Sequence, residues 1–279
     1  MKKVILDIGM APAGMAALCA AASGEGIEIA GVCTVGDGAA CSDASRQALA
    51  VLEKLHRDIS VYEGCRDSMA RRLYYHPNRN SRRPEKLFPS MKGEAQNLHA
   101  VTFLIETLRA AKQKITILTA GPLTNLACAL HTAPDIVQAI EEIIVVGGGV
   151  RRSDASACAE SNFLADPEAA EIVLNCETKV VLLPLDIELD EEQMARMGVK
   201  DTLLEELVGM LPSQKEDLFR GYAAGMSLTL PSLLVSEPYA ANVSLDHNLT
   251  AGMLVLSRSG ECIKSGANIV RAVSIDARP

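Results

Sequence analysis

The sequence predicts an α/β fold: a mainly parallel sheet flanked by helices, with antiparallel strands at one edge. Short apolar runs, typical of strands buried on both faces, alternate along the chain with segments of helical periodicity. Glycine-rich or polar turns follow several of these runs, as Gly147–Gly149 follow the run that begins at Ile143. The 279 residues contain no internal repeat and no low-complexity segment, so we expect a single domain over residues 1–279.

The elements are expected in the following order. Strands are predicted at 4–6, 27–34, 61–62, 115–118, 143–146, 179–184, 242–245, 253–256 and 269–273. Helices are predicted from the segment 8–14 to about Ala22, at 42–56, at 96–111, from 166 onward, and within 190–224. The helix that begins at Asp166 has a carboxylate at the N-cap and proline at the first helical position, which predicts a plain helix cap.

Composition excludes several classes of function. The net charge of −8 and the pI near 5.2 argue against nucleic acid as a partner. No run of about 18 apolar residues is present, so we expect no membrane span. The N-terminus begins with a strand-like segment and lacks the apolar region of a signal peptide, so we expect a cytoplasmic location.

Eight cysteines occur without a C-x-x-C pair or a spacing suited to zinc. They are expected to be small, buried, reduced side chains, since no histidine lies close to one of them in an ordered motif. No G-x-G-x-x-G with a trailing acid appears, which argues against a dinucleotide site.

The segment 66–93 has little periodicity and is predicted to be a flexible loop. It is rich in arginine and contains Tyr74 and Tyr75. One interpretation is a lid that grips an anionic ligand such as a sugar phosphate. The other is a solvated or subunit-contacting loop.

Polar residues gather between the apolar run at 143–146 and the helix that begins at Asp166. They include Asp154, Glu160 and Asn162. A strand, glycines, a polar loop and a helix N-terminus together form the usual mouth of an α/β ligand site. The alternative is that Glu160 and Asn162 only brace the loop through hydrogen bonds to backbone.

The ordered motifs resemble the inosine-uridine nucleoside hydrolase family over nearly the whole chain. The matching stretches are A-E-x-N at 159–162, D-P-E-A-A at 166–170, G-P-L-T-N at 121–125 and L-D-I at 185–187. The resemblance implies an open Rossmann-like core and the family reaction, hydrolysis of the N-glycosidic bond of ribonucleosides. It also implies a homo-oligomer, and a nucleoside or sugar-like small molecule as ligand. Glu160 and Asn162 fall on the family's ribose-hydroxyl ligands, and Asp154 replaces the family's loop asparagine.

The calcium positions of the family depart from this pattern. Its D-x-D-P-x-x-D-D signature keeps only Asp7, and glycine or alanine stands at the other aspartates (Gly9, Ala13 and Gly14). Ala120 falls on a backbone-carbonyl ligand of calcium. Thr229 and Leu230 match the histidine and aspartate of the family's L-H-D-P. The family's second strand ends in glycine-asparagine; here Asp37 lies near that asparagine, as a substitute or as a turn residue.

Calcium requires six to eight oxygen ligands, largely carboxylate. The sequence therefore predicts that no calcium cofactor is held and that calcium-dependent activity is lost. Two hypotheses remain: a catalytically silent binder of a ribose-like molecule, and an active divergent hydrolase that uses Asp7, Asp154 or Glu160 as its acid/base group without metal. Asp7, Asp154, Glu160 and Asn162 are the candidate ligand-binding residues.

Overall fold

The computed structural model describes residues 1–36, 41–70, 93–187, 189–196, 202–246, 249–258 and 269–275. In these residues one sheet of nine strands runs in the order β3-β2-β1-β4-β5-β6-β9-β7-β8. The strands are β1 (Lys2–Ile8), β2 (Ile27–Thr34), β3 (Val61–Glu63), β4 (Ile115–Ala120), β5 (Ile140–Val146), β6 (Lys179–Leu183), β7 (Leu234–Val243), β8 (Leu254–Arg258) and β9 (Ile269–Ile275). Neighbours from β3 to β9 pair in parallel, whereas β7 pairs antiparallel to both β9 and β8. The predicted fold class is confirmed.

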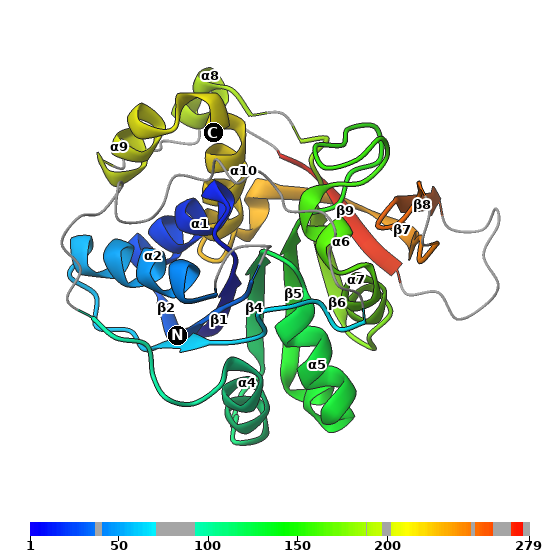
Figure 1. Cartoon of the computed structure of the whole chain (residues 1–279). Helices are drawn as coiled ribbons and strands as arrows, with labels where there is room; N and C mark the ends of the chain where they lie inside the picture. Colours follow the sequence, from blue (N-terminus) through cyan, green and yellow to red (C-terminus); the bar gives the residue numbers. More distant parts are fainter. Residues whose placement is uncertain are drawn as a thin grey trace.

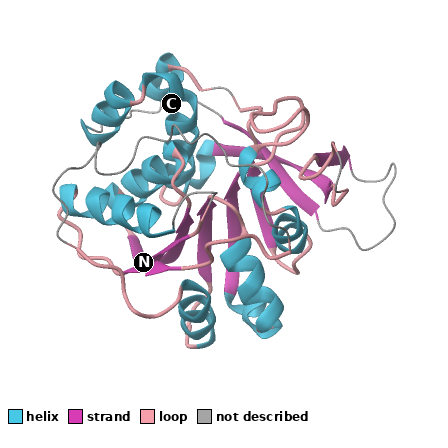
Figure 2. Cartoon of the chain, in the orientation of Figure 1, coloured by secondary structure: helices cyan, strands magenta, loops and turns pink. Residues whose placement is uncertain are grey.

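Helices cover both faces of the sheet (Figures 1 and 2). Figure 1 shows α1, α2 and α10 on one face and α4, α5 and α7 on the other. The described helices are α1 (Pro12–Ser23), α2 (Cys41–Lys54), α4 (Ala100–Arg109), α5 (Thr124–Thr132), α6 (Ser161–Ala165), α7 (Pro167–Leu174), α8 (Glu191–Arg196), α9 (Thr202–Met210) and α10 (Lys215–Ser227), with short 3-10 turns η1 (Pro134–Ala139), η2 (Pro212–Gln214) and η3 (Pro231–Leu233). None of these helices is long and apolar enough to cross a membrane.

The strand sequences explain the two cores. Along β1, Val4, Leu6 and Ile8 pack toward α1 and α10, while Ile5 packs toward α4 and α5. Successive side chains of a strand point to opposite faces, so a strand with helices on both faces needs an unbroken apolar run. The central strands of this chain have such runs, which is why the sequence predicted them well.

The edge beyond β6 differs from the prediction. The expected strand 242–245 is the end of the longer β7, which begins at Leu234. β9, the last strand in sequence, lies between β6 and β7. Pairing across such distances in sequence is a tertiary property that local periodicity does not encode. The core of the predicted loop, residues 71–92, and Asp37 lie outside the described residues.

Candidate functional site at the carboxyl edge of the sheet

The parallel strands bring their carboxyl ends to one edge of the sheet, where buried polar side chains gather. Asp7 near the end of β1 is paired with Cys33 of β2 and Thr119 of β4. It is 1% exposed. Its Oδ1 accepts a hydrogen bond of 2.9 Å from Nδ2 of Asn125, and its buried Oδ2 has no partner among the described residues. Burial raises the pKa of Asp7 to about 7, against the lowering effect of the Asn125 hydrogen bond.

Asn125, in the first turn of α5, is the residue that holds this part of the site together. Its Nδ2 donates to Asp7 and also to the Thr34 carbonyl at 3.0 Å. Its Oδ1 accepts from the Cys65 backbone N–H at 2.7 Å. The amide thus links β1, β2, α5 and the loop after β3. The sequence analysis used G-P-L-T-N only as a family motif and did not predict this role of Asn125. The available signal was a polar amide at the start of a helix that directly follows a buried strand.

The predicted calcium carbonyl is already engaged by backbone. Ala120 O accepts a hydrogen bond of 3.0 Å from the Gly9 N–H. α1 packs directly onto the same place, because a Cβ added at Gly14 would lie 2.8 Å from Gly9 O and 3.2 Å from Ala120 O. An aspartate at position 14 therefore has no room without a shift of backbone. Across the described ranges, no three acidic, histidine or cysteine side chains form a possible metal cluster. Among the described residues around Asp7, the packing at Gly14 and the engaged Ala120 carbonyl do not suit a calcium ion.

Glu160 is the N-cap of α6 and is 1% exposed. Its Oε2 accepts from the backbone N–H groups of Gly148 at 2.8 Å and Phe163 at 3.3 Å. Its Oε1 lies 3.1 Å from the Ser161 hydroxyl. Burial, with a contribution from the Asp154 charge, raises the pKa of Glu160 to about 7, while Arg220 and the backbone N–H groups oppose the rise.

The structure brings two predicted residues close to Glu160 and leaves one apart. Asp154 accepts from the backbone N–H of Ser161 at 2.8 Å and lies 3.3 Å from its hydroxyl, so Ser161 bridges Asp154 and Glu160. Asn162 donates from Nδ2 to the Val146 carbonyl at 3.1 Å. In the part of the chain that is described, no hydrogen bond joins any of these three to Asp7. Glu160 and Asn162 therefore make the backbone hydrogen bonds that the bracing interpretation expects.

A buried arginine, missed from the sequence, lies beside this carboxylate pair. Arg220 on α10 is 4% exposed and donates from a terminal nitrogen to Asp217 at 2.7 Å. Its charge also acts on the carboxyls of Asp154 and Glu160. Its Nε–H is buried and has no hydrogen-bond partner among the described residues. The sequence does contain a signal for a buried arginine: Arg220 is the one charged residue in the small and apolar run L-F-R-G-Y-A-A.

Thr229 and Leu230 do not belong to this site, contrary to the sequence prediction. α10 runs alongside α1, so a Cβ added at Gly221 would lie 2.0 Å from Ala13 O, near the start of α1 (Figure 1). One added at Gly24, just past the end of α1, would lie 2.9 Å from Thr229 Cγ2. Thr229 therefore lies at the far end of α1 from Asp7, and the adjacent Leu230 is 45% exposed. The first turns of α10, with Asp217 and Arg220, lie at the site instead. α10 runs in the same direction as α1, so the start of α10 lies near the start of α1 and its end lies near the end of α1.

Asp166 is confirmed as the helix cap. Its Oδ1 accepts from the Ala169 N–H at 3.1 Å. Its Oδ2 accepts from the Thr124 hydroxyl at 2.7 Å and from the Met69 backbone N–H at 2.8 Å. The cap thus also fixes the loop after β3 against α5 and α7.

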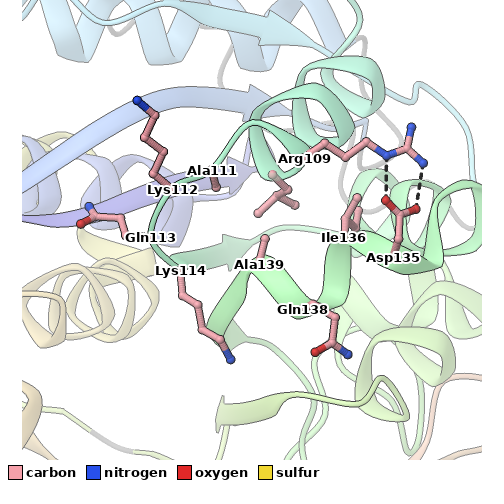
Figure 3. A pocket seen from close by; sticks show the side chains of 10 residues that line it. Arg109, Ala111, Lys112, Gln113, Lys114, Asp135, Ile136, Gln138 and Ala139 are labelled. Carbon is pink, nitrogen blue, oxygen red and sulfur yellow. Dashed lines mark hydrogen bonds and ion pairs between the residues drawn. The ribbon is translucent and has the colours of Figure 1, made fainter.

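A cavity of about 360 Å³ lies at the opposite edge of the sheet, between the end of α4, the start of β4 and η1 (Figure 3). The bidentate ion pair of Arg109 with Asp135, both bonds 2.8 Å, stands at its rim. Figure 3 shows the amino groups of Lys112 and Lys114 pointing away from each other rather than toward a shared point. This cavity contains none of the predicted site residues.

Comparison with known proteins gives a consistent result. The family model described as "Inosine-uridine preferring nucleoside hydrolase" matches residues 4–278. The pyrimidine-specific ribonucleoside hydrolase RihB of Escherichia coli O1:K1 is 30% identical over 188 residues, which are 67% of this chain and 60% of that protein. The matched region therefore spans less than two thirds of the length of that relative.

Solved structures share the fold at low sequence identity. The plant nucleoside hydrolase PpNRh1 superposes with a TM-score of 0.81 at 22% identity, covering 99% of this chain and 95% of that one. The purine-preferring ribonucleoside hydrolase from Gardnerella vaginalis gives 0.80 at 20% identity, with 99% and 94% covered.

Proposed function

Because this chain belongs to the inosine-uridine preferring nucleoside hydrolase family, we propose that it binds a ribose-like or nucleoside small molecule and has lost calcium-dependent hydrolysis. The observation that carries this proposal is the packing at the family's metal position. There the Ala120 carbonyl accepts from Gly9, and the first turn of α1 leaves no space at Gly14 for a carboxylate. Near the start of α1, charged side chains gather instead around Arg220 of α10.

A neutral polyol suits this arrangement best. Arg220 donates to Asp217, and its charge lowers the pKa of the carboxyl groups of Asp154 and Glu160. A carboxylate oxygen has two lone pairs and can accept two hydrogen bonds, so several of these oxygens can still accept from a sugar hydroxyl. The unpartnered Nε–H of Arg220 offers one donor in return. An excess of carboxylates over guanidinium disfavours an anion, so ribose is the ligand class we propose.

Calcium and hydrolysis provide the direct test. We expect calorimetry to detect no micromolar calcium binding, and inosine, uridine and adenosine to be hydrolysed at best marginally, with or without EDTA. Leu230→Asp serves as the matched variant: because Leu230 lies at the far end of α1, restoring this aspartate of the motif should not create a calcium site. Micromolar calcium affinity in the unmodified protein, or hydrolysis that EDTA abolishes, would overturn the proposal.

The candidate ligand-binding residues are tested by separating affinity from stability. Glu160→Gln keeps an amide oxygen for the Gly148 and Phe163 N–H groups but removes the charge. If the carboxylate contacts a sugar hydroxyl, the affinity for ribose or inosine should fall about 10-fold to 100-fold, as expected for a hydrogen bond to a charged group worth ~1.5–3 kcal/mol. Asn162→Ala should also weaken binding.

The control for these variants is Glu171→Gln on α7, which alters a carboxylate that accepts from the Val243 N–H. It should leave affinity unchanged. A thermal-shift screen of ribose, ribose phosphates and nucleosides finds the working probe, since ligand at about 100 times its Kd stabilises by ~2.7 kcal/mol. A large loss of melting temperature in Glu160→Gln with unchanged affinity would leave Glu160 with the bracing role alone.

A second candidate function is metal-independent hydrolysis. It is favoured by Asp7, whose Oδ2 is unpartnered and whose pKa is raised to about 7 by burial. A carboxyl that titrates near neutral pH is suited to general acid/base catalysis. EDTA-insensitive turnover that Asp7→Asn abolishes would favour this alternative over the silent binder. Family resemblance also leads us to propose self-association, which light scattering measures directly.

A further inference from the structure

Two cysteines that are distant in sequence lie with their thiols in contact. Cys65 is in the loop after β3, and Cys128 is on α5, 63 residues later. Their Sγ atoms are 4.0 Å apart, and both side chains are half-buried. Cys19, Cys33 and Cys41, by contrast, are buried.

Both backbones that carry this pair are fixed independently of the thiols. The Cys65 N–H donates to Asn125 Oδ1 at 2.7 Å, and its carbonyl accepts from the Gly36 N–H at 2.8 Å. Cys128 follows Asn125 by one turn of α5. The Asn125 side chain therefore ties the Cys65 backbone to the helix that carries Cys128. Bond formation has to bring the two sulfurs from 4.0 Å to the bonded distance of about 2.05 Å.

We propose that Cys65 and Cys128 form a reversible disulfide bond when the protein meets a low-molecular-weight disulfide such as oxidised glutathione. One thiolate attacks the glutathione disulfide, giving a mixed disulfide and releasing one glutathione thiolate. The second cysteine then attacks the protein sulfur of the mixed disulfide and releases the other glutathione. The two protein thiols are oxidised, one glutathione disulfide is reduced to two thiols, and the two protons end on the glutathiones.

The bond would fasten the loop after β3 to α5 beside the Asn125–Asp7 contact. It would also close the chain over the span that includes the basic segment 71–92. A disulfide that closes a long loop raises stability mainly by restricting the unfolded chain. We therefore expect the oxidised protein to melt several degrees higher than the reduced protein.

Burial raises the pKa of both thiols, so little thiolate is present at neutral pH. Bond formation should consequently be slow at neutral pH and accelerate about tenfold per pH unit.

The test incubates the full-length reduced protein with oxidised glutathione at about pH 8.5, where exchange is faster. Peptide mass spectrometry without reductant should find one internal cross-link, Cys65 to Cys128, and dithiothreitol should remove both the cross-link and the gain in melting temperature. Glutathione adducts without an internal bond, unreacted thiols, or a cross-link to other cysteines would each overturn the proposal.

Single variants provide the matched controls. Cys128→Ser should abolish the cross-link and the oxidation-dependent rise in melting temperature. Cys176→Ser alters another half-buried cysteine and should keep both. Because the main readout is made on the unmodified protein, it stands even if a serine variant folds poorly.

Discussion

Replacing Asn125 by alanine should lower the free energy of unfolding by about 3 to 5 kcal/mol, because the change strands several buried polar groups at once. The variant removes the donors to Asp7 Oδ1 and the Thr34 carbonyl, and the acceptor of the Cys65 N–H. Asn125 is fully buried, so water does not replace these bonds freely. For a chain of this size the melting temperature should fall by roughly 10 °C.

Asn175→Ala is the matched control, because Asn175 is an exposed amide that donates to the Glu171 carbonyl at 2.9 Å at the end of α7. Its loss should cost no more than about 0.5 kcal/mol. Urea denaturation of both variants measures the difference. If the two variants lose similar stability, Asn125 does not link the strand ends as the structure indicates.

Stability should fall as pH rises from about 4 to about 7, with Asp7 responsible for much of the change. Burial raises the pKa of Asp7 to about 7 in the folded protein, from an ordinary value of 3.8. Within this window the folded state retains a proton that the unfolded state has lost, so each step upward in pH favours unfolding. The stability that the protonated Asp7 contributes is fully present below its ordinary pKa of 3.8 and is lost above about pH 7. A shift of this size corresponds to roughly 4 kcal/mol at most. Glu160, whose pKa burial also raises to about 7, contributes in the same direction.

Asp7→Asn isolates the contribution of Asp7, because the amide resembles the protonated acid. The variant should match the unmodified protein near pH 4, exceed it in stability near pH 8, and show a shallower slope between them. Glu25→Gln alters an exposed carboxylate and should keep the original profile. Denaturant titrations across this range provide the measurement. An Asp7→Asn variant that is less stable than the unmodified protein at pH 8 would mean that Asp7 is charged and satisfied in the folded state.

The sequence by itself determined the central sheet and the helix cap at Asp166. Unbroken apolar runs such as Ile143–Val146 have one stable solution, a strand covered by helices on both faces, and this requirement is local. The cap is likewise local, because Asp166 and its Ala169 partner are three residues apart. The family resemblance rested on motifs of the same kind, and the match over residues 4–278 confirms it.

Only the tertiary structure decided which polar residues share a site. The sequence placed Leu230 at the metal position, whereas the direction of α10 along α1 carries Leu230 away and brings Arg220 to Glu160. Asn125 reaches partners 60 to 118 residues away, and the Gly9 N–H, just after β1, donates to the Ala120 carbonyl at the end of β4. Such contacts depend on how separate elements pack. A buried polar group forms hydrogen bonds with the groups that this packing places next to it. No spacing within a single segment specifies that partner.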